Sequence, residues 1–95
     1  MATSPNSRTT ATTTSVATST TSAQLFAANG RASARTVWNN SAVILYVKFG
    51  TTASATDAVV PIAAGAYYEF PQPLYAGVVH GILASGTGTA LATEY

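Results

Sequence analysis

The sequence predicts a small all-β protein, an antiparallel β-sandwich or barrel of about seven strands with an extended N-terminal arm. Turn residues recur at roughly ten-residue intervals after residue 22 and leave short apolar segments between them, a spacing that is typical of sandwiches and small barrels. β-Branched and aromatic residues, which favour strands, are frequent in these segments. No segment shows the apolar periodicity of a capped helix.

The N-terminal arm is expected to comprise residues 1–22. Fourteen of these 22 residues are Thr or Ser, and Val16 is the one clear apolar anchor among them. A segment of this composition has too little apolar surface to fold alone. It is either a disordered leader or an arm that adds a strand to a neighbouring subunit or threads between subunits. Strand addition needs mainly backbone hydrogen bonds, which this composition allows. We favour the arm.

The β-sandwich domain is expected to span residues 23–95, and turn residues delimit its first three strands. The first strand, 23–28, ends at Asn29-Gly30, and the second, 34–39, ends at a polar Asn-Ser pair. The third strand, 43–49, shows the clearest alternation in the chain. Its two faces consist of Val43, Leu45, Val47 and Phe49 on one side and Ile44, Tyr46 and Lys48 on the other.

A small, polar loop over residues 51–57 precedes the second half of the domain. Pro61 cannot donate a hydrogen bond to a neighbouring strand, so the strand 58–62 should lie at a sheet edge or contain a bulge. Three more strands follow, at 66–70, 78–84 and 89–95. In the first of these, Tyr68 and Phe70 share one face, and Tyr67 and Glu69 share the other.

Charge and size favour a protein that is covered by other protein. Only 7% of the residues are charged, against about 25% in an ordinary soluble domain. A folded unit of roughly seventy residues is marginal alone, and without cysteine it has no disulfides. The net charge of +1 gives no footprint for nucleic acid, and no apolar run reaches the roughly 18 residues of a membrane helix. We therefore expect a homo-oligomer or docking on a larger protein body, with no nucleic acid and no membrane.

We expect no enzyme activity, no cofactor and no metal site. His80 is the only histidine, and its position among apolar residues of a strand favours a partly buried side chain with one hydrogen bond. Glu69 and Glu94 could be read as the carboxylate pair of a glycosidase. Two single glutamates on separate strands are, however, usually solvated or paired with Arg or Lys.

The candidate functional residues are therefore those of an interface. Tyrosine suits this role because its ring is apolar while its hydroxyl can stay in water. Ordinary core packing and a carbohydrate platform of Tyr67, Tyr68 and Tyr75 are the alternatives for the aromatic residues. The candidate interface residues are Val16, Arg31, Arg35, Trp38, Tyr67, Tyr68, Tyr75 and Tyr95.

Several short motifs connect residues 22–95 with a known kind of protein. These are Arg31 and Arg35 followed by Val37-Trp38-Asn39, the strand Leu45–Gly50, the loop Ala53–Asp57, and the segments Pro61–Pro71, Gly77–Ile82 and Ala92–Tyr95. In these motifs the chain resembles small β-sandwich structural proteins of tailed bacteriophages, of the capsid decoration, cement or head-fibre type. The Thr/Ser-rich arm lies outside the resemblance.

The resemblance implies a virion structural protein that binds the major capsid protein or other virion proteins, as an oligomer for which we favour a trimer. It implies assembly in the host cytoplasm and brings no catalytic residues. The arm would lie across neighbouring capsid subunits and tie them together. A place at the neck, tail or fibre base is an alternative, and a glycan-binding module is an alternative of another class.

Overall fold

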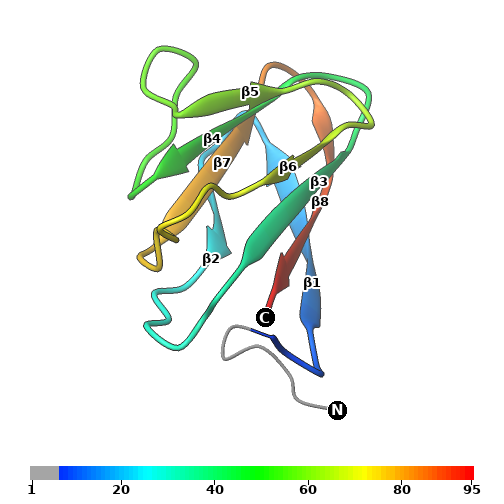
Figure 1. The fold of residues 1–95 in the computed structure, drawn as a ribbon. Coiled ribbons are helices and arrows are strands. Elements are labelled where there is room, and N and C mark those ends of the chain that lie inside the picture. The colour runs from blue at the N-terminus through cyan, green and yellow to red at the C-terminus, as the bar shows by residue number, and fades with distance from the viewer. Residues whose placement is uncertain (1–6) are drawn as a thin grey trace.

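Eight β-strands and no helix make up residues 7–95, the part of the chain that the computed structural model describes. The strands are β1 (Thr12–Ser19), β2 (Ala23–Phe26), β3 (Arg35–Asn40), β4 (Leu45–Phe49), β5 (Val60–Ile62), β6 (Tyr67–Glu69), β7 (Val79–Leu83) and β8 (Thr87–Glu94). They form two antiparallel sheets of four strands that pack face to face (Figure 1). The predicted all-β sandwich is confirmed.

The order of the strands defines the topology. One sheet has the order β1-β8-β3-β6, and the other has the order β2-β7-β4-β5. The strands pair as in one long antiparallel hairpin, namely β1 with β8, β2 with β7, β3 with β6 and β4 with β5. Successive pairs of this hairpin alternate between the two sheets. This arrangement is a jelly roll, the eight-stranded double sheet made of two Greek keys.

The seven strands predicted from the sequence are all present, most with trimmed ends. The strand that contains Pro61 is β5, which lies at the edge of its sheet as predicted. The predicted division of residues 43–49 into two faces is also confirmed, since Leu45 and Val47 are fully buried whereas Ile44 is exposed. In β6 and the residue after it, Tyr68 and Phe70 face the core, whereas Tyr67 and Glu69 are exposed.

The prediction that residues 1–22 form an arm apart from the domain is wrong for β1. This strand pairs with β8 of the same chain over its whole length, from Thr12 opposite Glu94 to Ser19 opposite Thr87. Backbone hydrogen bonds hold it, and its main inward side chains are Val16 and the buried Thr18. Threonine favours extended backbone, so a segment with almost no apolar residues can still complete a sheet. Residues 1–6 of the predicted arm lie outside the described residues.

The core lies between the two sheets and consists of the inward residues of both. Val37 and Ala92 come from the first sheet, and Leu45, Val47 and Val79 come from the second. Rings complete the core at one end of the sandwich, where Phe26, Phe49, Phe70 and Tyr75 pack at centroid distances of 4.7 to 5.5 Å. Aromatic packing of this kind contributes energy beyond the area that it buries.

Arg35 is the largest fully buried side chain, and it closes the same end of the sandwich. Its guanidinium lies over the Phe26 ring at 4.7 Å, and its Nε donates to a Glu94 carboxylate oxygen at 2.7 Å. Four more hydrogen bonds go to backbone carbonyl oxygens of Ala27, Tyr75, Ala76 and Gly77. Arginine has five N–H donors, so every donor of this buried cation has a partner.

Asn39 plays the corresponding part at the other end of β3. Its side chain is fully buried and donates to the carbonyl oxygens of Val43, Ile62 and Ala63 at 2.8 to 3.2 Å. The side-chain oxygen Oδ1 of Asn39 accepts a hydrogen bond from the Ser41 hydroxyl at 2.6 Å. Two inward polar residues of one strand therefore fix loops at both ends of the sandwich.

We predict that Arg35→Met lowers the free energy of unfolding by about 3–5 kcal/mol, because it leaves a half-buried carboxylate and several carbonyl groups without partners. Glu94→Gln should cost less, since an amide can still accept the hydrogen bond. Urea denaturation followed by circular dichroism measures both effects. The control is Arg31→Met at an exposed position, which should change stability by less than about 0.5 kcal/mol. Equal urea midpoints for Arg35→Met and Arg31→Met would contradict the prediction.

A second prediction concerns Thr18, whose buried hydroxyl has no hydrogen-bond partner among the described residues. Thr18→Val replaces this hydroxyl with a methyl group of similar volume and removes an unsatisfied polar group. We expect a gain of about 1 kcal/mol in stability. The matched variant Thr18→Ser keeps the hydroxyl and loses the methyl group, so it should be less stable than the wild type. A lower urea midpoint for Thr18→Val than for the wild type would show that the hydroxyl is satisfied in solution.

Candidate interaction surface

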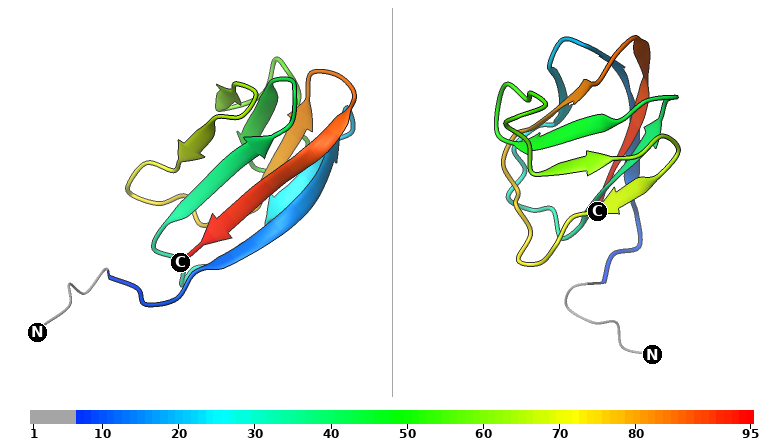
Figure 2. Two further views of the ribbon diagram at one scale, coloured as in Figure 1. Left: turned by 90° about the vertical axis from the view of Figure 1, so that its right-hand side faces the viewer. Right: turned by 90° about the horizontal axis from the view of Figure 1, so that it is seen from above.

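The most distinctive surface of the described chain is the outer face of the β1-β8-β3-β6 sheet, which Figure 2 (left) shows toward the viewer. Trp38 of β3 and Tyr67 of β6 lie directly opposite each other in the register and are 43% and 68% exposed. Leu91 of β8 lies on the other side of Trp38, and Ser15 of β1 lies beyond Leu91. These four residues form one row across the sheet, which we call the aromatic row.

Local hydrogen bonding holds the indole of Trp38 in place. Its Nε1–H donates to the carbonyl oxygen of Gly65 at 3.1 Å. Gly65 lies in the tight turn between β5 and β6 with a φ of 77°, a conformation that favours glycine. The turn itself is tied to β3, because the Gly65 N–H donates to the Asn39 carbonyl oxygen at 2.9 Å. The most exposed large side chains of this face therefore stand on a fixed frame.

Small hydroxyl and amide side chains border the aromatic row. Thr13 and Thr93 share a hydrogen bond between their hydroxyl oxygens at 2.9 Å, and Asn40 donates to the Thr89 hydroxyl at 3.2 Å. Within the register, Glu69 is the only charged residue on this outer face. An aromatic centre with few charges and a polar rim is the composition of a protein–protein interface.

The remaining charges lie elsewhere. Arg35 and Glu94 form an ion pair inside the sandwich, and Lys48 of β4, in the other sheet, pairs with Asp57 of the loop before β5. Of the seven charged residues, these pairs take four, and among residues 7–95 the structure shows no ion pair for Arg8, Arg31 or Glu69. Apart from Glu69 on its β6 edge, the outer face of the β1-β8-β3-β6 sheet can therefore be desolvated without burying a charge.

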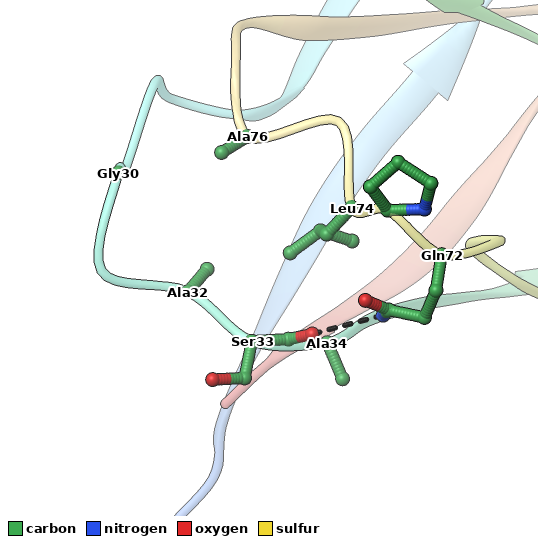
Figure 3. Close-up of a pocket in the computed structure, with 8 residues that line it drawn as sticks. Gly30, Ala32, Ser33, Ala34, Gln72, Leu74 and Ala76 are labelled. Atoms are coloured by element: carbon green, nitrogen blue, oxygen red, sulfur yellow. Dashed lines mark hydrogen bonds between the residues drawn. The ribbon is translucent and has the colours of Figure 1, made fainter. Parts of the chain in front are cut away.

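A groove of about 560 Å³ lies between the loop 29–34 and the segment 71–76 at the Arg35 end of the sandwich (Figure 3). Gln72 crosses it and donates from Nε2 to the carbonyl oxygen of Ser33 at 3.0 Å. Its lining residues are Gly30, Ala32, Ser33, Ala34, Gln72, Pro73, Leu74 and Ala76. None of them carries a charge or a catalytic group, so the groove has no evident chemistry.

The structure brings together two of the candidate interface residues, Trp38 and Tyr67. Tyr95 is 41% exposed but directly follows the end of β8, and Arg31 is exposed in the loop between β2 and β3. The prediction is wrong for Arg35, which is only 1% exposed. A charge in a charge-poor sequence suggested a surface role, whereas five hydrogen bonds within the chain hold it inside.

Three further candidates belong to the core and not to the surface. Val16, Tyr68 and Tyr75 are partly buried and pack against the core cluster. Tyr75 stacks on Phe49 with nearly parallel rings, and its hydroxyl donates to the Val78 carbonyl oxygen at 3.0 Å. The platform of Tyr67, Tyr68 and Tyr75 therefore does not form, because Tyr67 alone of the three points outward.

Leu91 and the threonines around it were not predicted as members of the surface. The alternation in β8 placed Leu91 between Thr89 and Thr93, but the sequence could not show that its neighbour across the sheet is Trp38. That neighbour is set by the register of β3 against β8, two strands that are more than forty residues apart in the chain.

The residues considered for catalysis are placed much as expected. His80 is half-buried, and its Nδ1 makes a hydrogen bond with the Ser22 hydroxyl at 3.0 Å. Glu94 pairs with Arg35, and Glu69 is exposed on the outer face. No group of three His, Asp or Glu residues that could hold a metal ion occurs in residues 7–95.

Comparison with family models, with curated proteins and with solved structures found no match to this chain. The described residues contain no helix long and apolar enough to cross a membrane. The class of the protein is therefore defined by its own fold and surface. It is a single small jelly roll with an exposed aromatic row on one sheet.

Proposed function

We propose that the chain is a bacteriophage virion structural protein, a capsid decoration or cement protein that binds the head shell as an oligomer. The observation that carries the proposal is the aromatic row, with its apolar members Trp38, Tyr67 and Leu91, on a sheet face with a single charge. The resemblance of its motifs to phage structural proteins supports the same function. The topology adds support by analogy of fold, since viral capsid domains are among the known jelly rolls.

The aromatic row has the properties of an interface centre. Tryptophan and tyrosine are enriched among the few residues that supply most of the binding energy at protein interfaces, and the contacts around such residues keep water out. Here the rim consists of Thr13, Thr36, Thr93, Thr89 and Asn40. Because the Trp38 indole is already held by Gly65, little side-chain entropy is lost on binding.

The proposed contact thus differs from the one expected from the sequence. The arm was expected to tie capsid subunits together, but Thr12–Ser19 is a strand of the chain's own sheet. The sheet face takes over the main contact in the proposal. Oligomerisation would still increase the affinity, since several weak contacts on one symmetric particle act together.

A glycan-binding module is the second candidate, and one observation favours it. Trp38 and Tyr67 lie side by side on an exposed sheet face, as the rings of a sugar-stacking platform do, and Glu69 and Asn40 nearby offer hydrogen-bond partners. Jelly rolls also include lectin domains. This platform consists of Trp38 and Tyr67 and not of the three tyrosines considered from the sequence.

We predict that Trp38→Ser and Tyr67→Ser each weaken binding to shells that lack the protein by roughly 30-fold, which corresponds to about 2 kcal/mol for an interface centre. Heads assembled without the chain and titrated with purified variants provide the measurement. The matched control is Tyr46→Ser, which removes a half-buried tyrosine from the outer face of the other sheet and should leave binding unchanged.

The outcomes separate the candidates. The proposed contact would be contradicted if both variants bound the shell unchanged while circular dichroism showed them to be folded. Binding to a glycan array that is lost in both variants, without shell binding by the wild type, supports the lectin candidate instead. A copy number per virion as low as that of one ring of subunits supports a neck or tail position.

A further inference from the structure

Three of the four sheet edges in the described chain are protected against pairing with another strand. The edge strand β5 has three residues and contains Pro61, which cannot donate to a neighbour. The edge strand β6 also has three residues and is soon followed by Pro71. The edge strand β2 has four residues and a register shift between Gln24 and Phe26. Short length, proline and irregular register are the usual means of blocking sheet edges.

The fourth edge, β1, has none of these protections. It is eight residues long, contains no proline, glycine or charge, and pairs with β8 without a register shift. No strand among residues 7–95 pairs with its outer side, as Figure 2 (left) shows. In such a strand every second residue directs its N–H and C=O away from the sheet, so about four residues of β1 offer unpaired groups.

We propose that β1 pairs with β1 of a second copy of this chain, antiparallel and about a two-fold axis, to give one continuous eight-stranded sheet. In a two-fold antiparallel pair, residues whose N–H and C=O groups point outward on one strand must stand opposite such residues on the other. The axis therefore passes between two copies of the same residue. The middle of the strand is Ser15 and Val16. About eight backbone hydrogen bonds can form between the two strands in this arrangement.

The charges around β1 favour a second copy in this orientation. Arg8 is the only charged residue among 7–22, four residues before the strand begins. A parallel, in-register pair would bring two Arg8 side chains together, whereas the antiparallel pair places them at opposite ends. Along the strand itself Thr, Ser, Ala and Val would face one another without like charges, and Thr13 already makes a hydroxyl–hydroxyl contact of this kind with Thr93.

The dimer also has a consequence for the proposed function. The dimer itself does not depend on that function, and only this consequence rests on it. A two-fold axis perpendicular to the sheet keeps both outer faces on the same side. The two aromatic rows would therefore point in one direction and could engage one flat partner at two positions, which raises the affinity without a new kind of contact. The symmetry is two-fold, in place of the trimer that the resemblance implies.

The test uses the full chain and sedimentation equilibrium, without any shell. Ser15→Lys together with Ala17→Lys places like charges on both sides of the proposed axis at exposed positions, and should weaken the dimer about tenfold or more. Ala63→Lys together with Ala64→Lys adds the same charge in an exposed turn and should leave the dimer intact. A mixture of the double lysine variant with Ser15→Glu/Ala17→Glu should restore a dimer that contains one chain of each.

A wild type that stays monomeric at high concentration, or a dimer or trimer that the β1 lysines do not weaken, would overturn the inference. Cysteine cross-linking provides a second measurement, because the natural chain has no cysteine. Ser15→Cys or Ala17→Cys, alone or mixed, should form a cross-linked dimer under mild oxidation, and Ala63→Cys should not. Shell binding by Trp38→Ser is measured separately, so failure of the dimer and failure of the shell contact give different results.

Discussion

The buried guanidinium of Arg35 is the interaction on which one end of this jelly roll depends. It connects four parts of the chain that lie far apart in sequence: β3 itself, Glu94 of β8, the segment after β2, and the segment 75–77. Burial of a charge is costly unless its partners are present, so the loss of any one of these contacts should weaken the others at this end. In a chain without disulfides, these hydrogen bonds and the ion pair hold the loops together.

The strand β3 combines this internal role with the external one. Its inward residues Arg35, Val37 and Asn39 fix both ends and the middle of the core, and the outward residue between the last two is Trp38. Period-two geometry makes these roles inseparable, because a shift of one residue would exchange the faces. The exposed indole therefore stands on a strand whose inward side chains are all buried, and a surface that does not need to be ordered on binding retains more of its contact energy.

The sequence allowed the strands to be predicted but not their partners. Alternation of apolar and polar residues located seven strands, and Pro61 placed one of them at an edge, because these are local properties. The strand β1 was missed as part of the fold because its pairing depends on backbone hydrogen bonds and threonine, which carry no apolar alternation. Arg35 was misplaced at the surface because its partner Glu94 is 59 residues away, and the contact of Trp38 with Tyr67 likewise follows from strand register and not from spacing.

An open edge and an exposed aromatic row on the same sheet are two surfaces that different partners can cover. A long unprotected edge ordinarily invites uncontrolled pairing, and the other three edges of this chain are blocked. Two-fold pairing of β1 uses up the edge in a single step, since each strand has only one free side and the resulting sheet ends in β6 on both sides. The aromatic rows are left uncovered by that step because side chains stand perpendicular to the sheet plane. Edge and face would thus serve two different partners, a second copy and a larger surface, without competing for the same atoms.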